Sequence, residues 1–178
     1  MNQVKEREYV GIAPLEEVLA YQNEDIIQKF LEHWDVTYEE ATEYFQEMKK
    51  WLWLSADSIY RESEGEARQE LGVTFSMTLL DEMWHAFILF TMDYQRFCKK
   101  YFGFYINHSP TTKSQKDKAI ADFEKDPDGM VAKAEEENAA QFSYIYDKLG
   151  AETLSKWYSD WTDKVTPEYL KETRKNPW

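Results

Sequence analysis

The sequence has a single cysteine, Cys98, and no long hydrophobic run. One cysteine cannot form an internal disulfide, which is typical of a protein in a reducing compartment. No stretch of about 18 apolar residues is present, and no basic segment precedes an apolar one near Met1, so neither a membrane span nor a signal peptide is expected. These absences predict a cytoplasmic protein whose thiol is a buried core residue.

The sequence is also short of positive charge. It has 21 Lys and Arg residues against 34 Asp and Glu residues, and a net charge of −13. Nucleic acid and anionic membranes are polyanions that bind clusters of Lys and Arg, and no such cluster is present. We therefore expect no nucleic acid and no membrane as partners, whereas a solvated acidic surface or a basic protein partner fits the charge.

Motifs of several common enzyme classes are missing as well. The chain contains no Gly-x-Ser-x-Gly sequence, no phosphate-binding glycine loop and no dinucleotide fingerprint. Cys98 follows His85 by 13 residues in one expected helix, so the two side chains lie on different turns. A Cys-His nucleophile pair is therefore not expected.

What the sequence does contain is helical periodicity along most of its 178 residues, of which 43% are hydrophobic. The pattern predicts an all-α fold, a single helical domain spanning 1–178 with a short N-terminal arm (1–13) and a C-terminal tail (175–178). We expect a bundle of about five to seven helices around a central buried helix at about 76–102, because that segment is apolar on nearly every side between Met83 and Met92.

Other helices have clear signals. Apolar residues recur at three- and four-residue intervals over 15–34, which predicts one helix there. Thr37 and Glu40 form a capping-box sequence before a second helix. A further helix is expected to end at Gly150, and the polar, glycine-containing stretch 61–72 is expected to be a connector.

The middle of the expected central helix holds a polar cluster of Asp81, Glu82 and His85. Asp81 and His85 are four residues apart and so share one helix face, where a carboxylate can orient an imidazole or bind a metal with it. Glu82 and His85 form the Glu-x-x-His spacing of di-iron bundles, but only one copy is present. The alternative is structural: Asp81 accepts a hydrogen bond from His85 inside the core.

His108 follows this helix and is the second candidate histidine. A helix that runs to Phe102 carries the chain about 25 Å from His85, and six extended residues bring it back by at most about 20 Å. A shared site therefore needs an early helix end or a tight reversal. Otherwise His108 is a turn residue or belongs to a separate site.

The segment 124–135 resembles a calcium-binding loop at several positions. Its first residue is Glu124, where the loop has the shorter Asp, its fourth is Pro127, and no paired second loop is visible. A turn that leads into a helix with acidic first residues explains the same sequence. These departures argue against calcium as a cofactor.

The segment 79–110 contains a series of residues in this order: Asp81, Trp84-His85, Tyr94, Cys98, Phe102-Gly103 and His108. In this series it resembles the glycine-rich-domain-containing-protein-like family, formerly a domain of unknown function, and the resemblance extends over about 40–158. Plant members have a further histidine where this chain has Phe87. The resemblance implies that Asp81, His85 and His108 are functional, without implying a reaction.

Two hypotheses follow from these residues. The first is an iron- or haem-dependent oxidative enzyme that modifies a peptide or small metabolite. Its catalytic residues would be Asp81, His85 and His108, its metal ligands would come from these residues and Glu82, and aromatic residues would line its cofactor pocket: Trp84, Phe87 and Tyr94. The second is a non-catalytic acidic adaptor or inhibitor that binds a basic protein and uses Asp81 and His85 to stabilise its core.

Overall fold

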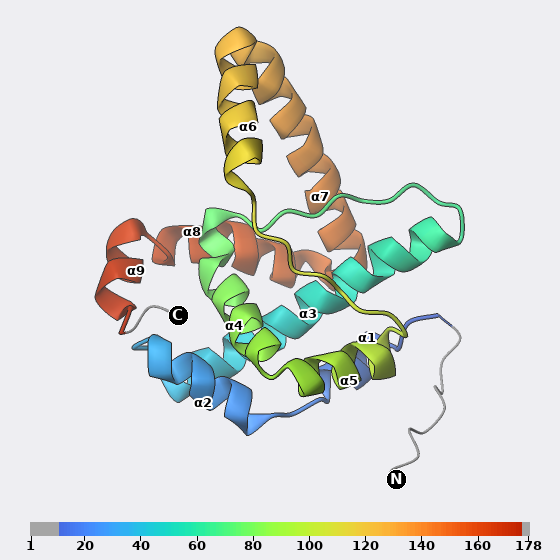
Figure 1. Cartoon of the computed structure of the whole chain (residues 1–178), viewed down its shortest axis with the longest axis vertical. Coiled ribbons are helices and arrows are strands. Elements are labelled where there is room, and N and C mark those ends of the chain that lie inside the picture. Colours follow the sequence, from blue (N-terminus) through green and yellow to red (C-terminus); the bar gives the residue numbers. More distant parts are fainter. Residues whose placement is uncertain (1–10, 176–178) are drawn as a thin grey trace.

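The computed structural model describes residues 11–175, and these residues form an all-α fold with no strand among them (Figure 1). Most of the expected arm (1–13) and tail (175–178) lies outside the described residues. The helical elements follow one another along the chain: α1 (Leu15–Leu19), α2 (Glu24–His33), α3 (Tyr38–Ser63), η1 (Phe75–Met77), α4 (Thr78–Leu89), α5 (Thr91–Tyr101), α6 (Lys113–Lys125), α7 (Pro127–Ser155), η2 (Lys156–Asp160), α8 (Trp161–Lys164) and α9 (Pro167–Thr173).

The core forms where α4 packs against α2 and α3. The predicted capping box starts α3: the Thr37 hydroxyl accepts from Glu40 N, and the Glu40 carboxylate accepts from Thr37 N. The buried faces of α3 and α4 are largely apolar and aromatic. The predicted fold class, an all-α single-domain bundle, is confirmed, and α4 lies at its centre.

The helix expected at 15–34 is divided into α1 and α2. Asn23 begins α2, because its side chain accepts a hydrogen bond from Asp25 N. Lys49 of α3 is buried beside this break and donates hydrogen bonds to Leu19 O and Tyr21 O, each at 2.6 Å. The carbonyls of Leu19 and Tyr21 thus find their hydrogen-bond donor on α3. The periodicity of 15–34 alone could not reveal this contact.

The central helix expected at 76–102 is also divided, into α4 and α5. Phe90 has non-helical dihedral angles, φ −85° and ψ 61°, and separates the two helices. The prediction of one long helix was wrong because the break has neither glycine nor proline. Leu89 and Met92 lie at this corner and are exposed, so the apolar run ends at the surface rather than inside the core.

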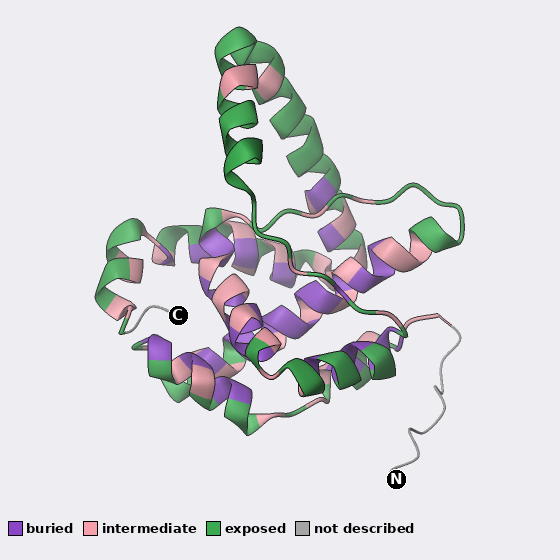
Figure 2. Cartoon of the chain, in the orientation of Figure 1, coloured by how far each residue is buried: buried purple, intermediate pink, exposed green. Residues whose placement is uncertain are grey.

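The helices α6 and α7 form a hairpin that extends away from the bundle (Figures 1 and 2). α6 was not predicted, and it has no buried residue. The calcium-loop pattern falls on the corner between the two helices, where the Asp126 side chain accepts from Gly129 N and begins α7. Gly150 does interrupt α7, with φ 85° and ψ 171°, but helix resumes beyond it.

No helix within residues 11–175 is both long enough and apolar enough to cross a membrane.

Candidate metal centre

Three polar side chains of α4 lie on neighbouring turns of its partly exposed face. Asp81 Oδ2 is 3.7 Å from His85 Nε2, and Glu82 Oε1 is 3.7 Å from His85 Nδ1. The two carboxylates therefore approach opposite nitrogens of one imidazole ring. This arrangement follows from helix geometry, because residues three and four positions apart project from the same side.

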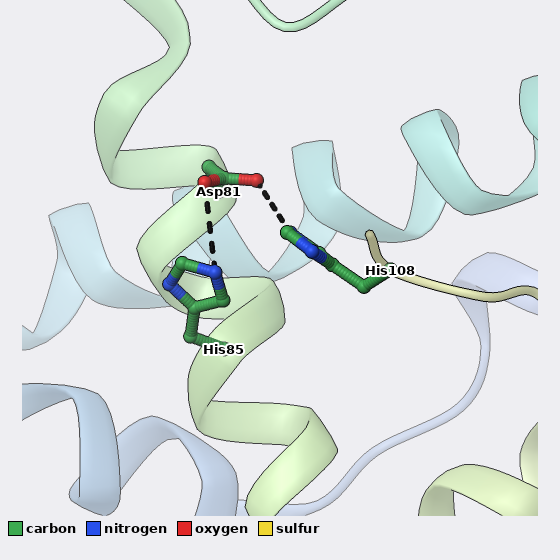
Figure 3. Close-up of side chains that lie close together, drawn as sticks. All are labelled: Asp81, His85 and His108. Carbon is green, nitrogen blue, oxygen red and sulfur yellow. Dashed lines mark hydrogen bonds and ion pairs between the residues drawn. The ribbon is translucent and has the colours of Figure 1, made fainter. Parts of the chain in front are cut away.

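His108 joins this group from the segment that follows α5. Its Nε2 atom lies 2.8 Å from Asp81 Oδ1, and its ring centroid lies 4.7 Å from that of His85. Figure 3 shows both imidazoles directed at the Asp81 carboxylate, one toward each oxygen. The early helix end at Leu89 is what allows this, since α5 then leads the chain back toward α4.

A buried brace fixes the returning segment. Trp84 Nε1 donates to Tyr94 Oη at 3.0 Å, and Tyr94 Oη donates to Ile106 O at 2.8 Å. These two bonds tie α4, α5 and the chain two residues before His108 together. The Trp84 and His108 rings meet edge to face with centroids 4.2 Å apart, which restricts the rotation of the His108 ring.

Cys98 belongs to the same brace rather than to a reactive site. Its side chain is buried, and burial raises the pKa of its thiol above the ordinary value, although a backbone hydrogen bond from Ile106 opposes this effect. A buried thiol with a raised pKa is a poor nucleophile. Cys98 therefore helps to hold Ile106, as expected for a core residue.

The three donors Asp81, His85 and His108 are close enough to share one metal ion. One ligand atom from each can be chosen so that all lie within 4.8 Å of one another. Donor atoms around a single ion are roughly 3 Å apart, because metal–ligand distances are about 2.0–2.2 Å. The His108–Asp81 pair already has such a spacing, at 2.8 Å, whereas His85 Nε2, at 3.7 Å from Asp81, would have to move closer to bind the same ion.

Glu82 lies on the far side of His85 and is not one of these three donors. Its Oε1 atom is also 3.7 Å from Arg174 Nη1, an atom of the residue that follows α9. The Glu82 carboxylate beside Nδ1 raises the pKa of His85, partial burial opposes the rise, and the charge of Asp81 adds to it. Glu82 is thus placed to accept the Nδ1 proton, which leaves Nε2 for Asp81 or a metal.

A cleft of about 1150 Å³ opens beside this group. Asp81, Trp84 and His108 line it, together with residues of α3 and of the segments 68–75 and 104–111. The side chain of His85 is 37% exposed and that of His108 is 15% exposed. An ion held by these residues would therefore be reachable by water and by a molecule bound in the cleft.

The other expected cofactor-binding aromatics are placed in the core. Phe87 is fully buried and packs against Tyr21, Tyr94 and Phe97. Tyr94 is also fully buried, and its hydroxyl is used in the brace. Neither lines the cleft, whereas Trp84 does.

Sequence patterns did not reveal two components of the site. Arg174 reaches Glu82 because the chain after α9 pairs with the chain at the end of α2, where Trp34 and Arg174 form an isolated β-bridge and the Arg174 guanidinium lies over the Trp34 ring. The segment 68–75 has no periodic pattern and no motif. Both components are brought in by tertiary contacts that no local spacing encodes.

Comparisons with curated proteins and with solved structures found no match. The model of an uncharacterised family, UCP032817-like, matches residues 23–124, which include Asp81, His85 and His108. This match corrects the expected resemblance to the glycine-rich-domain-containing family. Several of the residues on which that resemblance rested have packing or turn roles: Tyr94, Cys98 and Phe102 are buried, and Gly103 follows α5 with φ 84°. Because the family model matches more than half of the chain, the chain belongs to the UCP032817-like family.

Proposed function

We propose that this protein is a metal-dependent oxidative enzyme with one ferrous ion bound by His85, His108 and Asp81. The observation that supports this most directly is the convergence of two imidazoles and one carboxylate, all within 4.8 Å, at the edge of a large cleft. Such a set of two histidines and one carboxylate with open positions is typical of non-haem iron oxygenases.

The donor set favours a directly bound ion over haem. Haem iron takes only axial ligands from the protein, and the macrocycle must lie between side chains that cover its faces. Here Phe87 and Tyr94 pack in the core, and three donors approach a common point. Haem is therefore set aside, and the proposed cofactor is iron.

Each residue has a distinct role in this proposal. Asp81 supplies the negative charge that partly neutralises the ion, and the imidazoles of His85 and His108 supply neutral donors. Glu82 accepts the Nδ1 proton of His85 and thereby selects the tautomer whose Nε2 is free to bind. Ferrous iron would supply dioxygen binding, and the cleft would hold the substrate beside it.

The test is a metal titration of chelator-treated protein under anaerobic conditions. Calorimetry with Fe²⁺ is expected to show one ion per chain, and addition of nitric oxide is expected to give the electron paramagnetic resonance signal of a ferrous site with an open position. His108→Ala is expected to lose both. Binding of Zn²⁺ alone would contradict the oxidative chemistry, because zinc has no redox activity, and binding of neither ion would contradict a metal centre.

One observation favours the alternative, an acidic adaptor that binds a basic partner. The α6–α7 hairpin extends from the bundle and exposes Ile120, Phe123 and Val131. Exposed apolar side chains with acidic neighbours suit a protein–protein contact. In this alternative Asp81 and His108 are a structural hydrogen-bonded pair, and removal of metal leaves partner binding unchanged.

A further inference from the structure

The cleft beside the metal centre is larger than a pocket for a small metabolite. Its volume is about 1150 Å³, whereas pockets that hold drug-sized ligands occupy about 300–1,000 Å³. It lies between two segments without helix or strand, 68–74 and 104–111, with Trp51, Ser55 and Ile59 of α3 beneath them. The cleft therefore has room for a ligand larger than a small metabolite, bordered on two sides by these segments.

Neither segment is held by hydrogen bonds between backbone groups. Within residues 11–175, no backbone–backbone hydrogen bond involves 67–73 or 104–111. Side chains hold the segments instead: Ser58 Oγ bonds to the N–H and C=O of Gln69, and Tyr94 Oη donates to Ile106 O. The cleft is therefore bordered by peptide groups that can still pair with a ligand.

A side chain of α7 holds the first segment, 68–74, in place. The side-chain amide of Gln141 in α7 bonds to both Gly72 N, at 2.7 Å, and Gly72 O, at 2.9 Å. This two-point pairing is what a neighbouring β-strand would make with an extended residue. The C=O of Leu71 and the N–H of Val73 belong to the same two peptide units as these Gly72 groups, and because both peptide bonds are trans they face away from Gln141.

Side chains at the cleft are mixed in character. Val73, Phe75 and Tyr105 line it and are 38%, 56% and 45% exposed. Arg68 also lines it, but Glu62 and Glu70 already approach its guanidinium group. The lining thus suits a phosphate-bearing ligand poorly, and it combines apolar side chains with peptide groups in the way that a peptide-binding groove does.

We propose that the cleft binds an extended peptide, which pairs by β-type hydrogen bonds with the backbone of Leu71 and Val73 and brings a side chain to the Asp81–His108 edge. The net charge of −13 favours a peptide that carries positive charge. This inference rests on the proposed function for its meaning, because it makes the substrate of the metal centre a polypeptide. Binding itself requires no metal.

The probe is a fluorescently labelled octapeptide of alternating Lys and Val, measured by fluorescence anisotropy with metal-free protein. A second peptide of the same sequence, N-methylated at every other residue, cannot donate hydrogen bonds from one edge. The parent protein is expected to bind the first peptide at least about tenfold more tightly than the second, since tenfold corresponds to about 1.4 kcal/mol.

The variant Val73→Pro removes one N–H from the proposed pairing edge, whereas Val73→Ala shortens the side chain and keeps that N–H. Val73→Pro is therefore expected to bind the first peptide at least about tenfold more weakly than Val73→Ala does. Circular dichroism checks that both remain folded, and the N-methylated peptide tests the same bond without any mutation. Equal binding of the two peptides, or no binding of either, would overturn the inference. A chain that binds the peptide but no metal would overturn only the proposed function.

Discussion

At the scale of single residues, the proposed centre depends on which nitrogen of His85 faces Asp81. Nε2 lies on the Asp81 side and Nδ1 on the Glu82 side, both at 3.7 Å from a carboxylate oxygen. A metal-bound histidine usually donates its other N–H to such an acceptor, which orients the ring and makes the ligand more basic. Glu82 is therefore a positioning residue.

Replacing Glu82 by Gln is expected to weaken ferrous ion binding by about 10–100-fold, because the amide orients the Nδ1–H more weakly than a carboxylate. Calorimetric titration under anaerobic conditions measures this change. Glu39→Gln removes the same charge from an exposed position of α3 and is expected to leave the affinity unchanged. Equal affinities of the two variants for the ferrous ion would show that Glu82 does not position His85.

The sequence revealed part of this residue arrangement. The spacing of Asp81 and His85 was enough to place them on one face, since helix geometry is fixed. His108 could not be placed, because its approach depends on the break at Phe90 and on the hydroxyl of Tyr94. Neither feature has a sequence signal, as Phe and Tyr at these positions also fit an uninterrupted apolar helix.

At the scale of elements, the centre depends on how the segment after α5 is held against α4. In the Trp84–Tyr94–Ile106 brace, the hydroxyl of Tyr94 makes both hydrogen bonds. Loss of its hydroxyl leaves a buried donor and a buried acceptor without their partner. Such losses cost about 1–3 kcal/mol.

Tyr94→Phe is accordingly expected to lower the free energy of unfolding by about 1–3 kcal/mol and to weaken metal binding, because His108 lies two residues after Ile106. Urea denaturation and metal titration measure the two effects. The matched control is Tyr105→Phe in the same segment, where the side chain is exposed and the expected change is within about 0.5 kcal/mol. A Tyr94→Phe protein as stable as that control would show that the brace is dispensable.

The junction of α1, α2 and α3 gives a pH dependence. Burial lowers the pKa of Lys49 to about 8, from an ordinary value of 10.5. The unfolded chain then binds more protons than the folded one between these values, so stability rises with pH across this window and is lost as pH falls toward 8.

Relative to Lys49→Met, the parent protein is expected to gain about 2 kcal/mol of unfolding free energy between pH 8 and pH 10. Urea denaturation of both proteins at the two pH values measures their unfolding free energies. The other titrating groups are the same in both proteins, so their effects cancel when the two free energies are subtracted. A difference that does not change with pH would mean that Lys49 keeps an ordinary pKa despite its burial.

At the scale of the whole molecule, the bundle and the α6–α7 hairpin are built differently. The buried residues of α7 are Gln141, Ile145 and Thr153, all beyond the part that pairs with α6. α6 has none. The centre and its cleft lie on the bundle, so the hairpin contributes little to either, and the helical fold class could be predicted while this projecting shape could not.

Replacing residues 113–138 with a short glycine-serine linker is expected to leave metal binding unchanged and to alter the unfolding free energy by no more than about 1 kcal/mol. Metal titration and urea denaturation test this. Under the adaptor alternative the same variant loses its partner, because the exposed residues Ile120, Phe123 and Val131 are removed. Loss of metal binding in the shortened chain would instead show that the hairpin supports the centre.

The proposed metal centre is tested best by elemental analysis of protein purified without chelator from iron-supplemented cells. The parent and Asp117→Asn, which changes an exposed aspartate of α6, are predicted to contain close to one iron per chain. Asp81→Asn and His108→Ala are predicted to contain almost none while remaining folded by circular dichroism. Equal metal content in all four proteins, or a parent without metal, would contradict a metal centre at Asp81, His85 and His108.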